Sequence, residues 1–204
     1  MPAVPFATRL AVCLFASLSS ATIDARPAFS EPDTLHGGGF ASKKGTPIEG
    51  GDDLPILGTL CQVHTGELLV VDARSPDQDR FDALMADQAT GSSHAIDPEL
   101  LGLLRDLAKK HPLSWIEIVS GYRSPKYNEM LRKKGHHVSP HSQHSLGRAC
   151  DFRIVPPGED RGLDPRVLAQ EIRSLGWRGG IGVYPSKDDW FVHADVGQAR
   201  SWVN

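Results

Sequence analysis

The segment SQHSLGRACDF, residues 142–152, constrains the fold of this chain more than any other part of the sequence. His144 and Asp151 are seven residues apart, and on one continuous helix they would share a face but lie about 10 Å apart. Gly147 lies between them and favours a turn over a continuous helix. We therefore expect a histidine on a loop, a turn at Leu146 and Gly147, and an aspartate on the strand that follows. This arrangement brings the imidazole and the carboxylate together.

Side chains alternate between the two faces of the strand that is expected after this turn. Cys150, Phe152 and Ile154 form an apolar set on one face, and Asp151 lies on the other. The apolar set is expected to face the core. Cys150 is therefore predicted to be a small buried hydrophobic residue and not a metal ligand.

A third candidate ligand lies in the segment WFVHAD, residues 190–195. The strand expected here places His193 and Asp195 on the same face. Two histidines and one carboxylate form a ligand set that suits zinc, and they leave a fourth position open for water, as a catalytic zinc site requires. His144, Asp151 and His193 are therefore candidate zinc ligands, although each of them alone would more often be structural.

The N-terminal part of the chain is expected to lie outside the folded domain. Residues 1–25 contain one early arginine, a short apolar run and then small residues, which is typical of a secretory signal peptide. The run is too short to span a bilayer, and an uncleaved N-terminal anchor is the alternative. Residues 26–53 are rich in glycine and proline without apolar periodicity, which predicts a disordered linker. The folded domain is expected over residues 54–204, with no transmembrane segment in the mature chain.

Composition narrows the range of partners. The formal net charge of the 204 residues is -3, so there is no electrostatic reason to expect binding to nucleic acid. Removal of the signal leaves Cys61 and Cys150, and an oxidising compartment permits such a pair to form a disulfide. Spacing alone does not show whether the two thiols meet. A monomer is expected.

Local patterns predict both helices and strands. Residues 55–73 predict a hairpin, residues 97–110 predict a helix capped by Asp97, and Ser124 is expected to cap a second helix. The other predicted elements are a helix at 164–175 and strands at 115–119, 150–155, 180–184 and 191–196. Because strands and helices do not alternate strictly, the predicted fold class is α+β. We expect a small mixed domain with a central antiparallel sheet flanked by helices and a zinc site in the cleft.

The predicted ligand motif resembles that of a known family. The spacing Ser142-x-His144-x-x-Gly147-x-Ala149-x-Asp151 is similar to the first metal motif of the zinc D-Ala-D-Ala carboxypeptidases, dipeptidases and related murein endopeptidases. The segments SGYRS and FVH resemble the stretch before this motif and the second metal motif. Within the family, the HTGE hairpin, the helix that IDP begins and the GIGVYP segment are most similar to the periplasmic murein endopeptidase K subgroup. The resemblance covers about residues 57–204.

This resemblance implies an exported zinc metallopeptidase that hydrolyses amide bonds in peptidoglycan peptides in the periplasm. Zn²⁺ would be held by the three ligands named above, in a zinc peptidase domain over residues 54–204. Arg123 matches the family arginine that steadies the substrate carbonyl or carboxylate, and Tyr122 and Ser142 belong to the same motifs and are expected to contact substrate. The alternatives are a D-Ala-D-Ala type carboxypeptidase and a catalytically silent, zinc-containing wall-binding module.

The general base is where the chain departs from the family pattern. Many relatives carry an acid three positions before the last histidine, and this chain has Trp190 there. Asp188 and Asp189 precede the strand, and Asp195 shares a face with His193. Asp195 is the favoured candidate, either as a proton acceptor or as a residue that orients a ligand histidine. Asp189 is the second candidate. The missing acid keeps the silent wall-binding alternative open.

Overall fold

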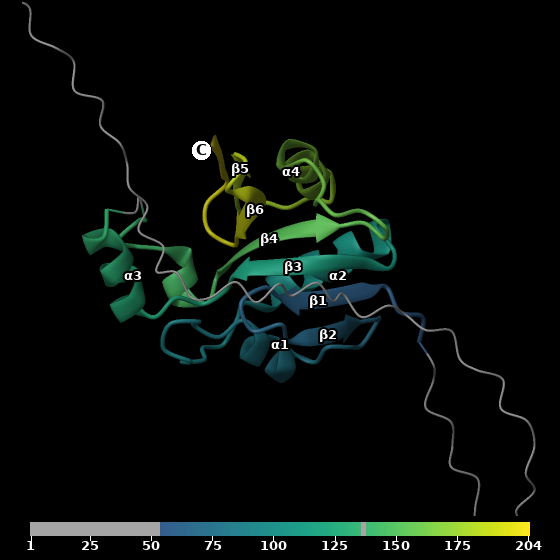
Figure 1. Ribbon diagram of the computed structural model, residues 1–204, viewed down its shortest axis with the longest axis horizontal. Coiled ribbons are helices and arrows are strands. Elements are labelled where there is room, and N and C mark those ends of the chain that lie inside the picture. The colour runs from purple at the N-terminus through teal and green to yellow at the C-terminus, as the bar shows by residue number, and fades with distance from the viewer. Residues whose placement is uncertain (1–53, 136–137) are drawn as a thin grey trace, which may run out of the picture. The chain divides into compact units, whose positions relative to one another are not determined.

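The strands of the described part of the chain form one seven-stranded sheet in the order β2-β1-β3-β4-β6-β5-β7 (Figure 1). The computed structural model describes residues 54–135 and 138–204. The predicted signal peptide and linker lie outside these residues and stay predictions. The strands are β1 (Gly58–Gln62), β2 (Leu68–Val71), β3 (Ser114–Ser120), β4 (Ala149–Val155), β5 (Gly180–Pro185), β6 (Trp190–Asp195) and β7 (Arg200–Val203).

The prediction of an antiparallel sheet is wrong for two strand pairs, because β1 pairs with β3 and β5 pairs with β7 in parallel. After the β1–β2 hairpin, the helices α1 (Gln78–Leu84) and α2 (Pro98–Lys110) carry the chain back, so β3 runs in the same direction as β1. Local sequence patterns report where strands occur. Which strands become neighbours depends on how the helices pack between them.

The helix predictions are confirmed for α2, α3 (Pro125–Lys133) and α4 (Pro165–Ser174). The Asp97 side chain accepts a hydrogen bond from the backbone N–H of Glu99, and Ser124 caps α3 in the same way. The short helix α1 and the strand β7 were not predicted. In α1 only Phe81 and Leu84 are buried, so the helix has almost no apolar period to recognise.

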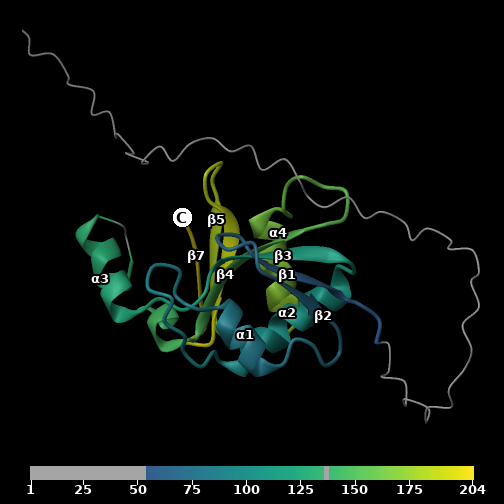
Figure 2. The same cartoon turned by 60° about the horizontal axis from the view of Figure 1, so that its bottom comes forward.

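Helices α1, α2 and α4 pack against one face of the sheet, and α3 stands apart from them (Figure 2). The predicted alternation in β4 is confirmed, because Cys150, Phe152 and Ile154 lie in the hydrophobic core with Leu104 of α2 and Ile172 of α4. The other face of β4 and β6 is therefore free of this helical layer. Within the described residues, no helix is both long enough and apolar enough to cross a lipid bilayer.

Cys61 and Cys150 are free thiols. Cys150 points into the core, whereas Cys61 alternates with the buried Leu60 and points to the opposite face of the sheet, in register with Glu117 of β3. The sheet itself separates the thiols, so the disulfide that the cysteine count left open does not form in this fold.

Candidate metal centre

The turn that carries His144 is a short 3₁₀-helix, η1 (Gln143–Leu146), which ends at Gly147. Gly147 has a φ of 66°, in the left-handed region, and a Cβ atom there would collide with the carbonyl oxygen of Ala95. The carbonyl of Gly147 also accepts a hydrogen bond from the backbone N–H of Asp97. The predicted turn is thus present, and it leads directly into β4 and Asp151.

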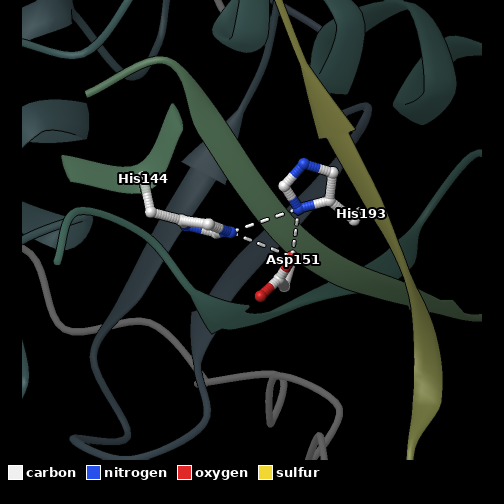
Figure 3. A group of neighbouring side chains, drawn as sticks. All are labelled: His144, Asp151 and His193. Atoms are coloured by element: carbon white, nitrogen blue, oxygen red, sulfur yellow. Dashed lines mark hydrogen bonds and ion pairs between the residues drawn. The ribbon is translucent and has the colours of Figure 1, made fainter. Parts of the chain in front are cut away.

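The structure brings the three predicted ligands together at one point (Figure 3). His144 Nε2 lies 3.2 Å from His193 Nδ1 and 3.2 Å from Asp151 Oδ1. His193 Nδ1 and Asp151 Oδ1 are 2.7 Å apart. A tetrahedral zinc ion with bonds of about 2.0–2.1 Å would hold its donor atoms about 3.3 Å apart. All three residues are buried. The donor types fit a zinc ion and two of the three separations match its geometry, whereas Asp151 Oδ1 and His193 Nδ1 would have to move apart slightly.

Each histidine uses its second ring nitrogen to hold its orientation. His144 Nδ1 donates to the carbonyl oxygen of Gly121 at 2.6 Å, and His193 Nε2 lies 2.9 Å from Asp195 Oδ2. With the proton on that second nitrogen, the nitrogen facing the cluster keeps a free lone pair. Such partners fix the tautomer and the ring plane of histidines that bind metals.

Arg123 occupies the other side of the Asp151 carboxylate. Its Nη2 donates to Asp151 Oδ2 at 2.7 Å and its Nε donates to Ser120 Oγ at 3.0 Å. Oδ1 of Asp151 is left facing the histidines. Burial by itself would raise the pKa of Asp151, but His144 and His193 outweigh burial and hold this pKa well below its usual value. Asp151 is therefore a carboxylate anion.

Asp195 is fully buried and lies behind the ring of His193, away from the cluster. Arg200 donates to both of its carboxylate oxygens, at 3.1 and 2.7 Å, and the backbone N–H of Gly197 donates at 2.8 Å. Burial opposes ionisation of Asp195, but the hydrogen bonds from His193, Gly197 and Arg200 lower its pKa to about 2. Of the two roles that the sequence left open, this geometry supports the one in which Asp195 orients His193.

A positive charge is favoured at this point. Burial alone would lower the pKa of His193, but its hydrogen bonds with Asp151 and Asp195 outweigh burial and raise the pKa to about 9. The carboxylates of Asp151 and Asp195 lie on either side of this imidazole and favour its charged form, although each also pairs with an arginine. The two carboxylates therefore stabilise a cation bound at this point, whether it is a proton or a metal ion.

The cluster lies in a cleft of about 660 Å³. The residues around the cluster in this cleft are Arg123, His141, Tyr184, Phe191, Arg200 and Trp202. A smaller cavity of about 270 Å³ adjoins Arg123 and Asp151 and is also lined by Asp189 and Tyr122. The ring of Tyr122 stacks on His94 at 4.9 Å. Ser142 is buried at the start of η1 and lines neither space, so the structure does not place its side chain near a substrate.

Comparison with known proteins agrees with this geometry. The family described as peptidoglycan L,D-endopeptidase MepK matches residues 59–202. The chain belongs to this family. Family membership confirms the resemblance to the murein endopeptidase K subgroup that the motifs indicated.

Curated MepK relatives match most of the chain. The probable peptidoglycan L,D-endopeptidase MepK of Haemophilus influenzae is 32% identical over 158 residues, which cover 72% of this chain and 79% of the relative. The peptidoglycan L,D-endopeptidase MepK of Escherichia coli K12 is 33% identical over 159 residues, covering 72% of this chain and 80% of the relative. No solved structure matches the chain.

The tryptophan in place of an acid has a structural explanation in this MepK-family chain. Trp190 lies on the face of β6 opposite to His193, because the two are three positions apart on a regular strand. Its Nε1 donates to the carbonyl oxygen of Gly162 at 2.9 Å, and the guanidinium of Arg161 lies 3.6 Å from the ring centroid. An acid at position 190 would point away from the cluster. Asp189 precedes β6 and lines the cavity at Arg123 and Asp151.

Strand β7 contributes to the site and was not predicted from the sequence. Arg200 holds Asp195, and the ring of Trp202 lies 5.2 Å from that of His193. Gly182 on β5 makes room for Trp202, since a Cβ atom there would lie 2.5 Å from Trp202 Cζ2. The only signal for β7 was the alternation of Arg200 and Trp202, which is too short to predict a strand.

Proposed function

We propose that this protein is a zinc-dependent endopeptidase that hydrolyses amide bonds in peptidoglycan peptides. The observation that carries the proposal is the convergence of His144 Nε2, Asp151 Oδ1 and His193 Nδ1 in an open cleft. The substrate class is that named for the relatives in Haemophilus influenzae and Escherichia coli. A periplasmic location, a cleaved signal and a monomeric state stay predictions.

Each residue around the proposed zinc site would have a distinct role in hydrolysis. Zinc, when held by the three ligands, supplies a Lewis acid that polarises the scissile carbonyl and makes water more acidic. Arg123 lines both cavities and presents a permanent cation beside Asp151, where it would stabilise negative charge that develops on the carbonyl oxygen. Asp195, held by Arg200, would keep the ring of His193 in its ligating orientation.

We infer that Asp189 is the carboxylate that accepts the proton during hydrolysis. Within the described residues its carboxylate has no hydrogen bond or ion pair, it is exposed to solvent, and it lines the cavity at Arg123 and Asp151. Asp195, in contrast, has both oxygens occupied by Arg200, His193 and Gly197. Among the acidic residues at 54–135 and 138–204, only Asp189 combines an available carboxylate with a position beside the substrate cleft.

Asp189→Asn is expected to lower kcat about 10²-fold or more, because a positioned general base contributes at this level. Zinc content and KM should stay close to those of the wild type. The neighbouring variant Asp188→Asn is the matched control, since Asp188 is equally exposed but does not line the cavity. Wild-type kcat in Asp189→Asn would assign the proton transfer to another group.

Digestion of defined wall fragments by the full chain tests the function itself. The zinc-loaded protein should cut cross-linked peptidoglycan fragments internally, lose this activity in a chelator and recover it on addition of Zn²⁺. Product masses separate the alternatives. Release of a single terminal residue would indicate a carboxypeptidase, and binding to wall sacculi with no product would indicate a silent wall-binding module.

A further inference from the structure

A second cavity, also of about 660 Å³, opens beside the cleft. It shares Ser139, His141, Gln143 and Arg200 with the cleft and is extended by Arg148 and Gly197. We call these six residues the basic recess. None of its described lining residues is acidic, whereas two carry a permanent positive charge. The recess is therefore an extension of the substrate cleft that is lined by cationic and neutral side chains.

Arg148 is the cation of the recess that is available to a ligand. Its side chain is 44% exposed, and its nearest carboxylate, Asp97 Oδ2, lies 3.9 Å from Nε, at the limit of an ion pair. One terminal nitrogen donates to the carbonyl oxygen of Val196 at 3.0 Å, which anchors the guanidinium without neutralising it. Arg200, by comparison, is already engaged by Asp195 through both terminal nitrogens.

Gln143 adds an unsatisfied acceptor. Its Oε1 atom is buried and has no hydrogen-bond partner among the described residues. Buried polar atoms normally have a partner, and leaving one without costs about 1–3 kcal/mol. Gly197 lets the chain pass close to this amide, since a Cβ atom at that position would lie 3.3 Å from Gln143 Cδ. A donor from a bound molecule would satisfy Oε1 once the Gln143 side chain turns toward the recess that it lines.

We propose that the basic recess binds a carboxylate-bearing part of the peptide substrate. Arg148 would pair with the carboxylate, and Gln143 Oε1 would accept a hydrogen bond from a nearby amide N–H of the same peptide. The cavity on the other side of Arg123 contains Asp189 and aromatic side chains, so the two ends of the cleft differ in charge. The substrate then binds in one direction. This inference rests on the proposed function.

Kinetics with paired peptides test the recess. The substrates are stem-peptide fragments in which each carboxylate in turn is replaced by a carboxamide. The zinc-loaded full chain should show a KM about tenfold higher for one of these carboxamides than for the parent. Arg148→Gln should raise KM for the parent by a similar factor, leave kcat unchanged and abolish the preference. Arg148→Lys should restore part of the preference for the carboxylate, because the charge remains but the forked geometry is lost.

Arg178→Gln is the matched control, because Arg178 is also exposed but does not line the recess. Binding of the same peptides to the chelator-treated full chain, measured by calorimetry, gives a readout without turnover. If the wild type cleaves all peptides equally well and Arg148→Gln changes nothing, the recess proposal is wrong while the function stands. If no peptide is cleaved but binding still depends on Arg148 and one carboxylate, the function is wrong and the recess stands.

Discussion

Replacing His144 with alanine is expected to abolish tight zinc binding and to lower peptidoglycan hydrolysis by at least about 10³-fold, since a Lewis acid supplies several kcal/mol of transition-state stabilisation. His144 contributes one of three donor atoms, and its ring is almost completely buried. Within the described residues, the ring of no other histidine lies close enough to replace it. Zinc content after dialysis and release of muropeptides measure the two effects.

Thermal unfolding separates loss of the site from loss of the fold. A ligand that binds only the native state stabilises it by about 2.7 kcal/mol at a concentration of 100 times its Kd. The melting temperature of the wild type should therefore rise with Zn²⁺, and that of His144→Ala should not. His111→Ala is the control, because His111 pairs with Glu171 and lies outside the cluster. Full activity of His144→Ala that resists a chelator would contradict the metal site.

Removal of the Asp195 carboxylate is expected to weaken both the fold and the site. In Asp195→Ala the buried Nε2 of His193, the guanidinium of Arg200 and the N–H of Gly197 lose their partner. Breaking a buried ion pair costs about 3–5 kcal/mol, and we expect about 3 kcal/mol because the Arg200 side chain is 45% exposed and reaches water. Chemical denaturation of the full chain measures this loss.

Asp195→Asn separates the positioning role from proton transfer. The amide keeps the shape of the side chain but loses the negative charge that orients His193. Zinc affinity, measured by competition with a chelator, should fall about 10- to 100-fold. Asp188→Asn should bind zinc as the wild type does. An Asp195→Asn protein with wild-type zinc affinity and no activity would instead make Asp195 the proton acceptor.

The sequence alone was sufficient to predict that His144 and Asp151 meet, because the turn and the strand that join them are local. Gly147 requires a turn between His144 and Asp151, and the period of two in β4 separates Asp151 from the core residue Cys150. These features depend on backbone sterics and on burial of apolar side chains, which operate over a few residues. The family motifs added His193.

The role of Asp195 required the tertiary structure. Alternation correctly placed Asp195 on the same face as His193, but it does not report which ring nitrogen the carboxylate contacts. That contact depends on Arg200 of β7, which reaches Asp195 because β7 pairs with β5 beyond β6. Trp190 raised a doubt about catalysis because the predicted strand began at residue 191. In the structure β6 begins at Trp190, so alternation turns this side chain away from the cluster.

The sequence by itself therefore determined the turn that joins His144 to Asp151 and the strand faces that carry Asp151 and His193, and the family motifs named the three ligands. The tertiary structure decided the parallel pairing of β5 with β7, the partners that orient each histidine and the basic recess next to the cleft. The physical reason is the range of the interactions. Turns and strand faces follow from neighbouring residues, whereas strand order and the partners of buried charges follow from the packing of segments that are distant in the chain.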